Sequence, residues 1–400
     1  MNKTNRVLAI LLLTAPISVP VVSHAQQKPP IAQYWMNVET ASGMSIPGMS
    51  GGMAGMMTGM MGGGQQQSGR KLYLHLGSQR PADAPNAAHE IPSGMSMGPS
   101  LPLLTPRGVE TRQPAERDRY ETMERPKGRM LIFWGCGEVT RAGQPVVIDF
   151  ARGGQMPNMV GRTVASGGPV SGRTNGLWPN QQDSKTVPDS ASLVGEHTIR
   201  GNYSPDIRFA LGAGQDFMDR VELNTTARGS GAVSVRWNAP TTATGYFATA
   251  MGGDGNDVVM WSSSDVQEIG GGLMDFIPPG EVARLIREKV VMPAQTTECT
   301  VPAEVAKRAQ MFNFIAYGPE ANFGFPPRPQ DPQWYAKVRF KSTASTFLGE
   351  TGGSGGRPQR ASPSAPASAP TGDQSAQPSA PAAPDPVKDG LNILRGIFGR

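Results

Sequence analysis

Histidine, cysteine and charged residues are scarce in this chain, and their scarcity limits the chemistry it can perform. Its 400 residues include four histidines and two cysteines, and charged residues make up 17%. His75, His89 and His197 lie far apart and follow no metal-binding spacing. No glycine-rich phosphate loop joins a strand to a helix. The sequence therefore carries no recognisable motif for metal-dependent or nucleotide-dependent catalysis.

The net charge is also small. Of the formal +5, Lys3 and Arg6 carry two charges and residues 351–400 a further two, which leaves +1 for residues 26–350. A nucleic-acid-binding domain shows a strongly basic patch or stripe. Nucleic acid is therefore not an expected partner.

Long hydrophobic runs are missing except near the N-terminus. Residues 7–22 are apolar, but two prolines interrupt them, and the run is too short to span a bilayer comfortably. A basic start precedes the run, and Ser23-His24-Ala25 places small residues where a signal peptidase cuts. We therefore predict a signal peptide over residues 1–25 and export of the mature chain to the periplasm or cell envelope. No cysteine follows the cut, so a lipid anchor is not expected.

Composition divides the mature chain into five parts. Glycine and methionine dominate the first part, and proline, alanine and serine dominate the fourth, which cannot bury apolar surface. The predicted parts are a flexible Met/Gly-rich segment at 26–69, a β-rich domain at 70–185, a sandwich-like domain with two helices at 186–349, a disordered linker at 350–386 and an amphipathic docking helix at 387–400.

The body of the chain shows mainly strand patterns. In "KLYLHLG", Leu72, Leu74 and Leu76 alternate with polar residues, and several other short runs are wholly apolar or alternate in the same way. Helical spacing occurs only over residues 278–293 and about 302–311. The predicted fold class is mainly β, with a sandwich-like body and two short helices.

One stretch resembles a known family. In "VSVRWNAPTTATGYFATAMG", Trp237 follows the alternating Val233 and Val235, and a turn with proline leads to Tyr246. Residues 216–264 are in this way similar to the second and third strands of a fibronectin type III domain. The resemblance implies an immunoglobulin-like sandwich and a role in binding. The whole chain also looks similar to exported bacterial proteins of unknown function.

The Met/Gly-rich segment allows three interpretations. Thioether sulfur is a soft ligand for Cu(I). Glycine at every fourth residue from Gly51 to Gly63 would allow close helix packing in a partner or membrane. The third interpretation is a plain linker. The candidate copper ligands are Met49, Met53, Met56, Met57, Met60 and Met61, with Met44 beside them and Met95 and Met97 as a second cluster.

A basic stripe is predicted in "WYAKVRFKS". Lys337, Arg339 and Lys341 share one face of the strand, and apolar residues occupy the other. Such a stripe could bind anionic envelope material, such as lipopolysaccharide or an acidic glycan. The commoner interpretation is a solvated face, or lysines that protect an edge strand from aggregation.

The two cysteines are predicted to form a disulfide. Cys136 follows a buried strand, and Cys299 lies between the two helical patterns. An even cysteine count in an exported chain favours pairing.

The end of the chain resembles a docking arm. Asp385 and Pro386 suit the start of a helix, which would align apolar residues on one side. An amphipathic peptide on a long tether suits an envelope protein groove or a membrane surface. The predicted docking residues are Leu391, Leu394, Ile397 and Phe398.

These patterns together favour an exported cell-envelope protein that binds a protein or another envelope component and is not a catalyst. Two alternatives remain at this point. One is a periplasmic Cu(I)-binding protein that uses the Met-rich segment. The other is a glycan-acting enzyme, because paired carboxylates need not be close in sequence.

Overall fold

The computed structural model describes the parts of the chain in which the strand patterns were found. The described residues are 29–43, 68–106, 128–150, 164, 172–254, 257–268, 270, 272–327 and 332–348. The predicted signal peptide, methionines 44–61, the linker and the docking helix lie outside them.

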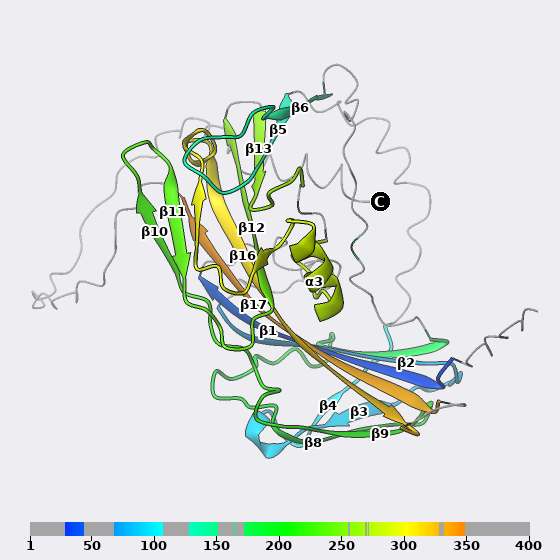
Figure 1. The fold of residues 1–400 in the computed structure, drawn as a ribbon. Coiled ribbons are helices and arrows are strands. Elements are labelled where there is room, and N and C mark those ends of the chain that lie inside the picture. The colour runs from blue at the N-terminus through cyan, green and yellow to red at the C-terminus, as the bar shows by residue number, and fades with distance from the viewer. Residues whose placement is uncertain are drawn as a thin grey trace, which may run out of the picture.

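The fold is mainly β and sandwich-like, as predicted, and three sheets are seen in the described residues (Figure 1). The large sheet has the order β6-β5-β13-β12-β16-β17-β1-β2-β7, and β14 pairs with β12. Its strands are β1 (Ala32–Gly43), β2 (Gly69–Ser78), β5 (Arg129–Trp134), β6 (Val146–Asp149), β7 (Thr174–Trp178), β12 (Gly245–Asp254), β13 (Asp257–Ser262), β14 (Met292–Pro293), β16 (Ala309–Phe325) and β17 (Trp334–Phe347).

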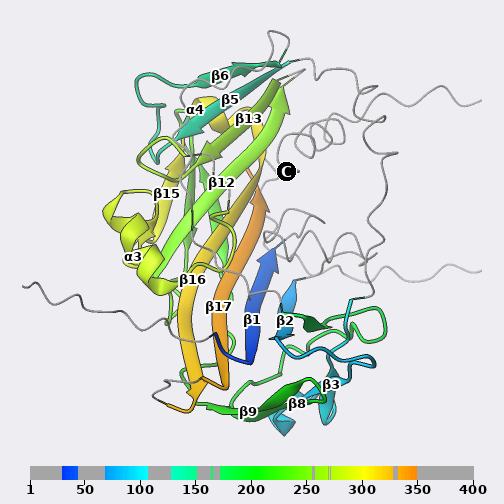
Figure 2. The ribbon, with the colours of Figure 1, turned by 90° about the vertical axis from the view of Figure 1, so that its right-hand side faces the viewer.

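Two smaller sheets cover one face of the large sheet. The four-stranded sheet has the order β4-β3-β8-β9, and the three-stranded sheet has the order β10-β11-β15. Figure 2 shows the four-stranded sheet at one end of the large sheet and β5 and β6 at the other. The strands are β3 (Ala87–Glu90), β4 (Ser100–Pro102), β8 (Gly195–Gly201), β9 (Ser204–Leu211), β10 (Leu223–Ala227), β11 (Val233–Trp237) and β15 (Glu298–Val301).

Strict alternation builds the main core. Leu72, Leu74 and Leu76 of β2 are buried in one apolar cluster with residues of both smaller sheets, such as Ile207 and Val235. Because successive side chains of a strand point to opposite faces, the intervening residues lie on the other face of the large sheet.

Helix α3 (Pro279–Arg287) packs on that other face. Its Val282 and Leu285 are buried in a second apolar cluster with Phe247 and Ile315 of the large sheet. The second predicted helix is shorter than expected, because α4 (Ala303–Ala306) ends before β16 begins at Ala309. A 3₁₀ turn lies at Ser93–Met95.

Part of the predicted flexible segment forms strand β1, so the prediction is wrong for these residues. The β1 residues Ala32–Gly43 were assigned to the Met/Gly-rich part, but they pair with β17 on one side and β2 on the other. Tyr34, Met36 and Val38 are buried in the core, and the side chains between them lie on the other face of the sheet. Burial of one face of β1, not the composition of the neighbouring segment, decides its structure. The large sheet also takes strands from both sides of residue 186, so it does not divide at the predicted domain boundary.

The strands that carry the fibronectin-like residues lie in different sheets. Trp237 is in β11 of the three-stranded sheet, and Tyr246 is in β12 of the large sheet. Their rings meet edge to face between the sheets, with centroids 5.6 Å apart.

Candidate functional site on the polar face of the large sheet

The face of the large sheet that does not pack on the smaller sheets carries a dense array of polar and aromatic side chains, here called the polar face. Register places them in rows across neighbouring strands. One row is Glu320, Arg339, Asn37 and Tyr73, and the adjacent rows are Tyr317, Lys341, Glu39 and Lys71 on one side and Asn322, Lys337, Trp35 and His75 on the other.

One end of the polar face is closed by the segment that precedes α3. The Arg339 Nη1 donates to the Phe276 carbonyl over 3.1 Å, and the Lys341 Nζ donates to the Met274 carbonyl over 3.2 Å. Both cations also lie over the Phe276 ring. These contacts hold residues 274–276 against the sheet.

Burial changes the chemistry of this closed end. Arg339 and Lys341 are 6% and 1% exposed. Burial lowers the pKa of Arg339 to about 10, although the charges of Asp275 and Glu320 oppose the shift. The predicted basic stripe on the surface is therefore wrong for these two residues. Strand β17 lies between β16 and β1, so an edge-protecting role is also wrong. An edge and an interior strand can share one alternating pattern, and only pairing separates them.

Glu39 balances the cations of this end. Its Oε2 lies 3.7 Å from the Lys341 Nζ, and its Oε1 accepts a 2.7 Å hydrogen bond from Thr343. Burial raises the pKa of Glu39, but the charges of Lys341 and Lys71 and the hydrogen bonds outweigh this effect and lower the pKa overall. The Lys71 Nζ is buried without a hydrogen-bond acceptor in the described part of the chain, so the charge of Glu39 is what offsets it.

The other end of the polar face contains a pocket of about 190 Å³. Backbone and side chains of two antiparallel strands and of β1 line it. Tyr335 is 37% exposed, and its ring lies against Gly324, where a Cβ atom would come within 2.9 Å of the ring. The pocket is lined by Gln33, Trp35, Asn322, Phe323, Tyr335, Ala336 and Lys337.

Cations lie next to the indole at the pocket. The Arg339 guanidinium carbon is 4.5 Å from the Trp35 ring centroid, and the Lys337 Nζ is 5.2 Å from it. The Glu320 Oε1 accepts from the Lys337 Nζ over 2.7 Å and from the Asn322 Nδ2 over 2.8 Å. These contacts fix the directions of the pocket side chains before any ligand arrives, which lowers the entropy lost on binding.

His75 extends the array beside Trp35. Its Nε2 lies 3.1 Å from the Asn175 Oδ1 of β7. Burial lowers the pKa of His75, and the hydrogen bond to Asn175 partly opposes this. Burial raises the pKa of the neighbouring Tyr73, and the charge of Glu39 adds to the shift. Both side chains are therefore neutral at pH 7.

Most of this site is not predicted by the sequence patterns. Trp35 and Gln33 fall in the predicted flexible segment, and the predicted basic stripe contains Lys337 without its strand partners. The alternation of Gln33, Asn37 and Glu39 with apolar residues in this strand was a usable signal.

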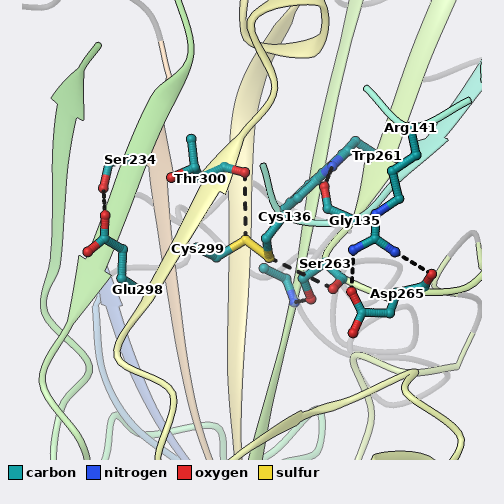
Figure 3. Close-up of a disulfide and its surroundings, with 11 residues drawn as sticks. Gly135, Cys136, Arg141, Ser234, Trp261, Ser263, Asp265, Glu298, Cys299 and Thr300 are labelled. Carbon is teal, nitrogen blue, oxygen red and sulfur yellow. Dashed lines mark hydrogen bonds and ion pairs between the residues drawn. A yellow bond between two sulfur atoms is a disulfide. The ribbon is translucent and has the colours of Figure 1, made fainter. Parts of the chain in front are cut away.

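The predicted disulfide is present in the structure. Cys136 and Cys299 are bonded, with their Cα atoms 5.3 Å apart (Figure 3). The Gly137 amide donates to the Thr300 carbonyl over 2.8 Å beside the bond. The disulfide joins the end of β5 in the large sheet to β15 in the three-stranded sheet. It therefore links two sheets and takes no part in the polar face.

Two histidines that looked scattered in the sequence meet in the core. His89 lies in β3, and both His89 and His197 are fully buried. The Tyr34 hydroxyl lies 2.8 Å from the His89 Nδ1, and the His89 Nε2 lies 2.9 Å from the His197 Nδ1. The His197 Nε2 lies 2.7 Å from the Leu193 carbonyl. Pairing of β3 with β8 brings these residues together, which spacing along the chain could not predict.

The other candidate metal sites receive no support from the described residues. Met95 and Met97 are buried in the main core at 0% and 5% exposure. The part of the chain that the structure describes has no group of three or more His, Cys, Asp or Glu side chains arranged to hold a metal ion. Within the same part, no helix has the length and apolar character needed to cross a membrane.

No protein-family model matches the sequence, and no curated protein matches it. The resemblance of residues 216–264 to fibronectin type III domains therefore remains a proposal from the sequence.

Proposed function

We propose that this is an exported cell-envelope protein that acts by binding a glycan at the Trp35 pocket. The observation that carries the proposal is the composition of that pocket. Two aromatic side chains, Trp35 and Tyr335, offer flat apolar surfaces, while Gln33, Asn322 and Lys337 supply polar groups at its edge. A sugar ring has apolar C–H faces and a rim of hydroxyl groups, so it matches this combination.

The size of the pocket and the state of the two carboxylates on the polar face favour binding over catalysis. At about 190 Å³, it is smaller than the typical site for a drug-sized ligand and suits a single sugar ring. The Glu320 carboxylate is engaged by Lys337 and Asn322, and Glu39 is engaged by Lys341 and Thr343. A pair of carboxylates facing each other across an open cleft would favour glycoside hydrolysis instead.

Replacement of Trp35 tests the proposal. Titration calorimetry with purified envelope polysaccharides should show binding to the full protein and at least a tenfold loss in Trp35→Ala, equivalent to about 1.4 kcal/mol. Trp134→Ala is the matched control, because Trp134 is a partly exposed tryptophan at the distant end of the same sheet. It should bind normally. Equal binding by both variants, or no binding to any polysaccharide, would contradict the proposal.

A further inference from the structure

Among the residues that the structure describes, strand β10 forms an unprotected sheet edge. It lies at one side of the order β10-β11-β15, and Figure 1 shows it on the outer flank of the molecule. Four of its five residues, Asn224–Ala227, are exposed. Edge strands commonly carry charges, prolines or bulges that block pairing with another chain. The sequence Leu-Asn-Thr-Thr-Ala contains none of these.

Register shows which backbone groups of β10 point outwards. The Arg228 amide donates to the Ala232 carbonyl just beyond the strand, so residues of even number exchange hydrogen bonds with β11. On the opposite side of β11, the Trp237 amide donates to Thr297, which agrees with this alternation. The amides and carbonyls of Leu223, Thr225 and Ala227 therefore point away from β11, and they have no partner among the described residues.

We propose that β10 pairs with β10 of a second copy of this chain, antiparallel and centred on Thr225. In this register Thr225 faces Thr225 of the second copy, and Leu223 faces Ala227. The outward-pointing groups of the three residues then form six hydrogen bonds between the two strands. The two three-stranded sheets join into one continuous sheet of six strands.

Charge supports a second copy as the occupant. The same register places Glu222 of each copy directly opposite Arg228 of the other, just outside the strand ends. Glu222 is exposed, and the Arg228 side chain is 40% exposed while it binds Glu298. Opposite charges facing each other across an antiparallel pair favour it, and a parallel or shifted pairing would lose both contacts.

A strand pair of this length forms a weak dimer. Stable specific interfaces bury roughly 1,200–2,000 Å², which five residues a side do not reach. The expected behaviour is therefore reversible association that rises with protein concentration, independent of the proposed glycan site.

Cysteine cross-linking tests the register. In Thr225→Cys, the two new thiols face each other at a Cα separation of about 5.5 Å, within the range of a disulfide. Mild oxidation of the full chain should give a reducible dimer, and the native cysteines do not interfere because none of the described ones is free. Thr226→Cys is the control, since residue 226 faces residue 224 in this register. Equal cross-linking of both variants, or none of Thr225→Cys, would overturn the proposal.

Proline substitution and charge reversal provide a second measurement. Thr225→Pro removes an outward-pointing amide and leaves the bonds to β11 intact, so the protein should fold and lose its association in sedimentation velocity. Glu222→Lys should weaken association, whereas Glu196→Lys makes the same change on an exposed residue of the four-stranded sheet and should not. Association unaffected by both Thr225→Pro and Glu222→Lys would place the contact elsewhere and refute the proposal.

Discussion

At the scale of single residues, charged side chains whose alternating pattern is typical of an exposed strand face are buried as an ion pair. Lys341 is 1% exposed and Glu39 is also 1% exposed. The alternation in β17 correctly separated the charged side chains from the apolar ones. It could not show that residues 274–276 cover the charged side, because that contact joins residues more than 60 positions apart.

Glu39→Gln tests whether this charge balance stabilises the fold. The substitution leaves Lys341 and Lys71 buried without a counter-charge, so the free energy of unfolding at pH 7 should fall by about 3–5 kcal/mol. Urea unfolding followed by circular dichroism measures the change.

A double variant and an exposed pair serve as controls for Glu39→Gln. Adding Lys341→Met removes one of the two cations left without a counter-charge, and it should restore part of the lost free energy of unfolding. Asp206→Asn breaks exposed pairs with Arg208 and Arg200, and it should cost less than about 1 kcal/mol. If Glu39→Gln is as mild as Asp206→Asn, the buried pair does not contribute as described.

At the scale of elements, the four-stranded sheet is joined to the large sheet through a chain of hydrogen bonds in the core. The Leu193 carbonyl only accepts, so the His197 Nε2 carries a proton, and when His197 is neutral its Nδ1 accepts from the His89 Nε2. The His89 Nδ1 then accepts from Tyr34. All three hydrogen bonds form when both rings are neutral, so neither ring needs a further proton to satisfy its partners.

This arrangement predicts a loss of stability in acid. Burial lowers the pKa of His89 well below 6.5, and the charge of His197 adds to the shift; burial also lowers the pKa of His197, which its bond to Leu193 opposes. Above pH 6.5 neither the native nor the unfolded state binds extra protons at these two histidines. Below it the unfolded chain binds more protons than the native state, so the free energy of unfolding falls by up to about 1.4 kcal/mol per pH unit for each histidine.

His89→Gln isolates the effect. Glutamine can accept from Tyr34 and donate to His197, but it cannot bind a proton. Urea unfolding between pH 7.5 and about pH 5 should therefore show a shallower decline than in the unchanged protein. Parallel profiles for the two proteins would mean that His89 does not limit stability in acid.

At the scale of the whole molecule, the sequence predicted the kind of fold and missed how its parts meet. Alternation identified strands such as β2, β11 and β17, and cysteine count with the predicted compartment gave the disulfide. Alternating polarity does not determine which strands pair. It therefore could not predict that β1 pairs in parallel with β17, which lies some 300 residues further along the chain. It also could not predict the polar face, whose rows form only when β16, β17, β1 and β2 are in register.

The disulfide should be the strongest single constraint on how the three-stranded sheet sits on the large one. Its cysteines are 163 residues apart, and closing a loop of that length is worth about 5 kcal/mol in the chain-entropy model. Cys136→Ala combined with Cys299→Ala should therefore lower the free energy of unfolding by about 2–5 kcal/mol, measured in urea.

The Gly137 amide, bonded to Thr300 beside the disulfide, should exchange with deuterium faster in this variant, while amides of β1 change less. The unchanged protein treated with a reductant should match the double variant. A double variant as stable as the unreduced protein would show that packing of the two sheets, centred on Trp237, Tyr246 and Phe314, is sufficient without the bond.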